Sequence, residues 1–172
     1  MSISKINGVL YKLLSYITAA MSFGMVAIVF WQVIARYIVQ SSSGWTQEVT
    51  LVLFMWVTML GSAMAVRSAG HVSMTLLVNN LKGYAKPIVK MIALVICEAF
   101  YVMLAVSGYA VSMRFLHAGT TQLKIPMPVV YSSFVVGGIV MSIFALELMW
   151  NELKEIARIK RDKNNGTGGA AL

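Results

Sequence analysis

The sequence predicts an all-α membrane protein with four transmembrane helices and both termini in the cytoplasm. Of its 172 residues, 59% are hydrophobic and only 12% are charged, a far more apolar composition than that of an average soluble domain. The apolar residues form long continuous blocks, as membrane spans do. Eleven of the fourteen lysines and arginines lie in the segments on the side of the termini, which the positive-inside rule places in the cytoplasm.

The first predicted span covers residues 13–35. Lys5 and Lys12 precede it, and Arg36 follows its apolar block. A secretory signal peptide is the alternative interpretation, but the apolar block continues well past Ala20. Because that is longer than the core of an ordinary signal peptide, we expect an uncleaved span.

The second predicted span covers residues 48–66. An uncharged run from Val49 to Val66 lies between Glu48 and Arg67. At about 1.5 Å per residue, a helix of this length nearly crosses a hydrocarbon core of about 30 Å. Gly61, with Thr58 and Ala65 near it, gives the helix a face of small side chains, which a neighbouring helix can approach closely.

The third predicted span covers residues 87–113, with Pro87 in its first turn. Between the second and third spans, residues 67–86 are polar with apolar residues interspersed. This pattern predicts a possible short helix along the membrane surface.

The fourth predicted span covers residues 128–150, and Pro126 and Pro128 open it. Gly137 and Gly138 predict a tight helix contact. We expect residues 1–157 to form one four-helix transmembrane domain. The final segment, 158–172, is predicted to be a disordered cytoplasmic tail, since it is basic and ends in Gly and Ala.

Residues for catalysis or for cofactor or metal binding do not come together in the sequence. The single cysteine, Cys97, cannot form an internal disulfide. We find no glycine-rich phosphate loop and no histidine pair at ligand spacing, and the predicted topology puts His71 and His117 on opposite sides of the membrane. The net charge of +8 flanks apolar blocks, which indicates membrane lipid rather than nucleic acid as the partner.

Two charged residues at the outer ends of the first two spans have several interpretations. Arg36 and Glu48 can form a salt bridge that pins the first hairpin, contact a partner, or remain separate interfacial charges. Glu48 is also predicted in the first turn of the second helix, where a carboxylate suits the positive end of the helix dipole. Trp45, with Tyr37, belongs to the predicted outer aromatic belt.

Three further polar residues are candidates for contacts. Glu98 lies near the middle of the third span, either as a proton or coupling-ion site or as a hydrogen-bonding contact between helices. We favour the contact, because no second acid lies at similar depth. Arg67 suits the negative end of the second helix, and His71 is interpreted as an interfacial residue that alternatively docks a partner or a lipid headgroup.

Several short motifs, taken in order, resemble those of the Q component, the small membrane subunit of tripartite ATP-independent periplasmic (TRAP) transporters. The resemblance covers residues 10–150. Gln47 stands where the family often has a first acid, and Ser73 or Thr75 stands where it often has Asp. The matching segments are Arg36-Tyr37, Trp45-Thr46-Gln47-Glu48, Leu60-Gly61-Ser62-Ala63, Arg67-Ser68-Ala69-Gly70-His71-Val72, and Thr121-Gln122-Leu123-Lys124-Ile125-Pro126-Met127-Pro128 followed by Tyr131.

The resemblance implies a partner in the bacterial inner membrane. That partner is a large membrane subunit, the M component, which binds the substrate and sodium. A soluble periplasmic binding protein delivers an organic anion to it. The small subunit braces the large one and binds neither substrate nor cofactor.

Two other classes of protein remain as alternatives. A small multidrug exporter is a four-span dimer with an essential acid in its first span, but residues 13–35 contain no acid. A membrane scaffold unrelated to transport is the third interpretation. Co-purification with a much larger membrane protein separates the main interpretation from both alternatives.

Overall fold

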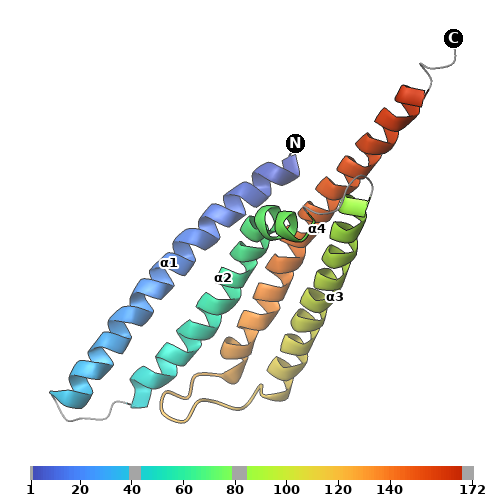
Figure 1. Ribbon diagram of the computed structural model, residues 1–172. Helices are drawn as coiled ribbons and strands as arrows, with labels where there is room; N and C mark the ends of the chain where they lie inside the picture. The colour runs from blue at the N-terminus through green and yellow to red at the C-terminus, as the bar shows by residue number, and fades with distance from the viewer. Residues whose placement is uncertain (1, 39–43, 79–84, 168–172) are drawn as a thin grey trace.

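In the computed structural model, α-helices are the regular elements of the described residues, which are 2–38, 44–78 and 85–167. Side chains are described for residues 7–38, 44–68, 88–158 and 161. Four long helices follow one another along the chain (Figure 1): α1 Ser2–Tyr37, α2 Gly44–Val78, α3 Ala85–Arg114 and α4 Met127–Thr167. Each contains an apolar stretch long enough to cross a membrane, which confirms four candidate spans.

The helices form one layer in the spatial order α1, α2, α4, α3 (Figure 1). Helix α4 packs between α2 and α3, and α1 packs along the other side of α2. Among the described residues, α1 and α3 make no contact, so the layer does not close into a bundle. Both termini lie at one end of this layer, which we call the termini end (Figure 1). The α3–α4 loop lies at the opposite end, the loop end.

The main core joins α1, α2 and α4. Phe144 of α4 and Ala63 of α2 are fully buried, and Leu14 of α1 and Leu60 of α2 pack in the same cluster. In the most apolar window of α4, 44% of the residues are buried, against 6% in α1 and α3 and 11% in α2. Helix α4 is therefore the centre of the fold.

Close backbone approach occurs at the glycines of α3 and α4. A Cβ at Gly137 would lie 2.8 Å from Met59 Cβ, and one at Gly138 would lie 2.9 Å from the Tyr101 carbonyl oxygen. The predicted tight contact at Gly137 and Gly138 is confirmed. Gly61 differs, because a Cβ there would meet nothing within 4 Å. Within the described residues, no helix packs closely at Gly61, and contact of this small-residue face with a partner stays a prediction.

Two helices are longer than the sequence predicts. Helix α2 is unbroken to Val78, so the predicted short surface helix begins as a continuation of α2, whose last turns bend away from the line of its apolar part (Figure 1). Residues 79–84 lie outside the described residues. Helix α4 continues to Thr167, past residue 158 where the predicted tail begins, and disorder of the tail stays a prediction. The Lys and Arg residues at positions 158–167 are good helix formers.

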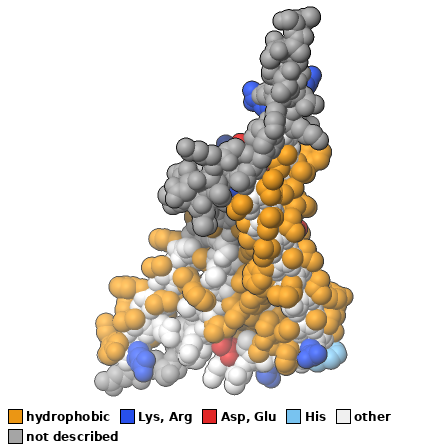
Figure 2. All heavy atoms as spheres, turned by 45° about the vertical axis from the view of Figure 1, so that its right-hand side comes forward, with side chains coloured by type: hydrophobic (Ala, Val, Ile, Leu, Met, Phe, Trp, Pro, Cys, Tyr) orange, Lys and Arg blue, Asp and Glu red, His pale blue; other side chains and the backbone are white. Residues whose placement is uncertain are grey.

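The surface of the layer is largely apolar. Figure 2 shows hydrophobic side chains over the middle of one face, with Lys and Arg toward the two ends. Exposed large hydrophobic residues occur on all four helices. This is expected for helices that are surrounded by lipid or by another membrane protein.

Candidate functional site

A polar junction at the termini end ties α1, α2 and α4 together. We call Asn7, Arg67 and Glu147, with the rings of Tyr11 and Phe144, the termini-end junction. Asn7 Nδ2 donates a hydrogen bond to Glu147 Oε2 at 2.8 Å, and Arg67 Nη1 donates to the Asn7 carbonyl oxygen. Arg67 Nε lies 3.9 Å from Glu147 Oε2. The guanidinium carbon lies 5.2 Å and 5.5 Å from the ring centroids of Tyr11 and Phe144.

This junction is partly withdrawn from solvent. The side chains of Arg67 and Glu147 are 24% and 14% exposed. Because each charge has its partners within the chain, neither leaves an uncompensated charge in the apolar layer. The junction includes the described contact between α1 and α4, which are otherwise separated by α2.

A second ion pair ties α4 to α3 at the same end. Lys90 Nζ lies 2.9 Å from Glu152 Oε1, and the two side chains are 12% and 16% exposed. The central helix α4 thus carries two carboxylates with partners on its two flanks. Glu147 pairs with α1 and α2, and Glu152 pairs with α3.

At the loop end, Glu48 holds the α3–α4 loop against the start of α2. Its carboxylate accepts hydrogen bonds from the backbone amides of Gln122 at 2.7 Å and Leu123 at 2.9 Å. Trp56 Nε1 donates to the Val129 carbonyl oxygen at 3.1 Å, so α2 is also tied to the start of α4. We call the contact of Glu48 with these two amides the loop-end clamp.

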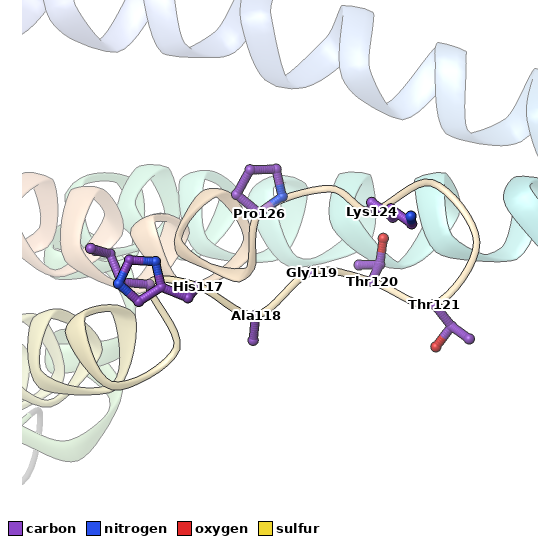
Figure 3. A pocket seen from close by; sticks show the side chains of 8 residues that line it. His117, Ala118, Gly119, Thr120, Thr121, Lys124 and Pro126 are labelled. Atoms are coloured by element: carbon purple, nitrogen blue, oxygen red, sulfur yellow. The ribbon is translucent and has the colours of Figure 1, made fainter.

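The α3–α4 loop folds back on itself beside this clamp. The Thr120 amide donates to the Ile125 carbonyl, and the Met127 amide donates to the Ala118 carbonyl. Lys124 has a left-handed backbone, with φ of 53°. A pocket of about 430 Å³ lies along the loop, with His117 toward one end and Lys124 toward the other (Figure 3).

The structure gives Glu48 partners other than those predicted. No ion pair joins Arg36 and Glu48, although both side chains are described; Arg36 is exposed. Helix α2 begins at Gly44, so Glu48 lies beyond the first turn, and that placement was wrong. Trp45 lies in the first turn and is 45% exposed; its place in an outer aromatic belt stays a prediction.

Arg67 was predicted to suit the negative end of the second helix, but it does not lie at the end of that helix. Helix α2 continues to Val78, so Arg67 lies well inside it and turns toward Asn7 and Glu147. His71 lies in the helical backbone of α2, but its side chain lies outside the described residues, so its role stays a prediction.

Glu98 lies in α3 with Oε2 buried and without a hydrogen-bond partner in the described part of the chain. This oxygen therefore does not make the predicted hydrogen bond between helices. Within the described residues, no group of three or more His, Cys, Asp or Glu side chains comes together as a metal site.

Sequence reasoning did not identify Asn7 and the paired role of Glu147. A signal was present, because Arg67 and Glu147 are charges near the termini end of two neighbouring apolar blocks. Opposite charges at the same depth are candidates for pairing. The partners of Glu48 could not be found in this way, because backbone amides carry no sequence signature.

Comparison with known proteins identifies the chain. Residues 25–155 match the family described as "Tripartite ATP-independent periplasmic transporters, DctQ component". The chain belongs to this family. It is therefore a small permease subunit of a TRAP transporter and a multi-pass membrane protein, not an enzyme.

Individual relatives of this DctQ-family chain agree. The "Sialic acid TRAP transporter small permease protein SiaQ" of Vibrio cholerae is 24% identical over 159 residues, 90% of this chain and 89% of the relative. The "C4-dicarboxylate TRAP transporter small permease protein DctQ" of Rhodobacter capsulatus is 29% identical over 99 residues, 56% of this chain and 44% of the relative. The DctQ protein of Vibrio cholerae is 25% identical over 85 residues, 49% and 37% of the two chains.

Proposed function

We propose that this chain is the small permease subunit of a sodium-coupled, binding-protein-dependent uptake system for an organic anion, and that it braces the large membrane subunit. The observation that carries the proposal is the open layer. Because α1 and α3 make no contact in the described structure, the four helices enclose no path between them. The solute therefore travels through the partner, and this chain widens and fixes the partner's scaffold.

The polar contacts support a bracing role. The termini-end junction and the Lys90–Glu152 pair join neighbouring helices at one end, and the loop-end clamp does so at the other. Charges that are engaged in holding helices together are poorly suited to binding a solute in turn. A layer fastened at both ends is suited to resist the motion of a transporting partner.

The relatives support a proposal for the class of transported solute. One relative is named for sialic acid and two for C4-dicarboxylates, and both are organic anions. We propose the same chemical class here, with the anion and sodium bound on the large subunit. A periplasmic binding protein delivers the anion at the loop end, which requires both termini to lie in the cytoplasm.

Reconstitution tests this proposal. Vesicles that contain this chain, the large membrane subunit and the binding protein should take up an organic anion when an inward sodium gradient is applied. Vesicles that lack this chain should lose uptake, and vesicles with this chain alone should show none. Uptake by this chain alone, or full uptake without it, would refute the bracing role.

A further inference from the structure

Helix α4 continues past the other three helices at the termini end as a basic segment (Figure 1). Three cationic side chains of this segment recur at steps of four and three residues, so they lie along one side of the helix, and all three are exposed. Trp150, which is 58% exposed, precedes the first of them by four residues on the same side. We call these residues the α4 stripe: Trp150, Lys154, Arg158 and Arg161.

The cations of the α4 stripe differ from other cations at the termini end in their partners. Arg67 and Lys90 are each paired with a carboxylate of α4. Within the described part of the chain, no ion pair includes a cation of the stripe. Lys154 instead lies over the ring of Trp150, with Nζ 5.4 Å from the ring centroid. The charge of the stripe is therefore left for a group outside this chain.

The spacing within the α4 stripe is unfavourable for the helix by itself. Lys154 and Arg158 are four residues apart, and Arg158 and Arg161 are three apart. Like charges at these spacings lie next to each other on the helix surface and destabilise it. A ligand with several negative charges removes this repulsion, so the stripe is suited to an anionic surface rather than to a single counterion.

We propose that the α4 stripe binds the phosphate groups of anionic phospholipids in the leaflet at the termini end. Tryptophan favours the boundary between the hydrocarbon core and the headgroups. At about 1.5 Å per residue, Lys154 lies about 6 Å beyond Trp150, Arg158 about 12 Å and Arg161 about 16 Å. The headgroup layer on one side of a bilayer is about 5–8 Å thick. Lys154 therefore lies within that layer, the long side chain of Arg158 can extend back to it, and Arg161 lies beyond it.

An acidic surface of another protein is the alternative occupant, and the order of side chains along α4 favours lipid. On the turns before Trp150, the exposed large side chains of α4 are apolar and include Ile143 and Leu146. Apolar residues, then tryptophan, then cations follow the order of acyl chains, interface and phosphates in a leaflet. A protein bound along the helix would use Arg161 as much as Lys154, whereas a leaflet reaches the cations in order of their distance from Trp150.

Quenching of Trp150 fluorescence by brominated phospholipids measures which lipid lies beside the α4 stripe. In the full chain, the other three tryptophans are replaced: Trp31→Phe, Trp45→Phe and Trp56→Phe. This reporter chain is reconstituted in brominated phosphatidylglycerol, brominated phosphatidylcholine and mixtures of the two. The anionic lipid should bind beside Trp150 at least about fivefold more tightly than the zwitterionic lipid. Lys154→Gln should lower this preference at least about threefold and Arg158→Gln about twofold, because each removes a cation near the phosphates.

Matched variants separate the charge at the leaflet from other effects. Arg161→Gln makes the same change of charge beyond the headgroup layer and should leave the preference unchanged. Lys154→Arg keeps the charge and should keep the preference. A chain that retains Trp45 in place of Trp150 reports from the loop end, where Lys154→Gln should have no effect.

The inference does not depend on the proposed function, because the large membrane subunit is absent from this measurement. Equal binding of the two lipids beside Trp150 would overturn it, as would a preference that Lys154→Gln and Arg158→Gln leave unchanged. If the lipids bind equally and Lys154→Gln and Arg161→Gln weaken co-purification with the large subunit to the same extent, the stripe binds an acidic protein surface instead.

Discussion

Neutralising Glu147 tests whether the termini-end junction holds the helical layer together. In Glu147→Gln, the side-chain carbonyl can still accept the hydrogen bond from Asn7, but the charge opposite Arg67 is lost. Two unit charges at the observed 3.9 Å attract by about 4 kcal/mol at an effective dielectric constant of 20. Neither side chain is more than a quarter exposed, so screening by solvent removes only part of this energy.

The expected loss of unfolding free energy is about 2–4 kcal/mol. It falls below the full cost of an isolated buried charge, because Arg67 keeps its hydrogen bond to the Asn7 carbonyl and its contacts with the two rings. The assay is unfolding by sodium dodecyl sulfate in mixed micelles, followed by circular dichroism. Glu155→Gln is the matched control, because Glu155 is exposed on the same helix and should change the free energy by less than about 0.5 kcal/mol.

A double-mutant cycle isolates the pair. Arg67→Gln combined with Glu147→Gln should be less destabilising than the sum of the two single changes by at least about 1 kcal/mol, because the double variant leaves no unpaired charge. If Glu147→Gln unfolds at the same detergent fraction as Glu155→Gln, or if the two single changes are additive, the junction does not stabilise the layer and our reasoning is wrong.

Three further predictions concern other helix contacts. Gly138→Ala should destabilise the fold by about 1–3 kcal/mol, because its Cβ would meet the neighbouring backbone. Gly24→Ala should instead stabilise the fold by about 0.5–1 kcal/mol, because a Cβ at Gly24 has open space. Unfolding in mixed micelles measures both variants, and equal effects would contradict the prediction. Glu48→Gln should speed trypsin cleavage in the α3–α4 loop, because the charged acceptor for its amides is lost, and Arg36→Gln should not; equal rates would contradict the clamp. Glu98→Gln should retain uptake in reconstituted vesicles, since its buried Oε2 makes no hydrogen bond within the described residues. Lost uptake with normal assembly would identify Glu98 as a coupling-ion site.

The sequence by itself determined the class of fold and the number of spans. Apolar blocks of this length can only be helices in lipid, because the backbone must satisfy its own hydrogen bonds. The charges between the blocks predict where the spans end. The short motifs around Trp45 and Arg67 indicated the transporter family, which the comparison over residues 25–155 then showed.

Only the tertiary structure decided which helices are neighbours and what each charge does. Four apolar helices could pack in several orders, and the approach at Gly137 and Gly138 allows α4 rather than α1 to occupy the centre. The pairing of Arg67 with Glu147, and of Glu48 with loop amides, follows from that order. Residue types and depth made Arg67 and Glu147 candidates for pairing but could not decide the pair without the helix order, and the amide partners of Glu48 carry no sequence signature.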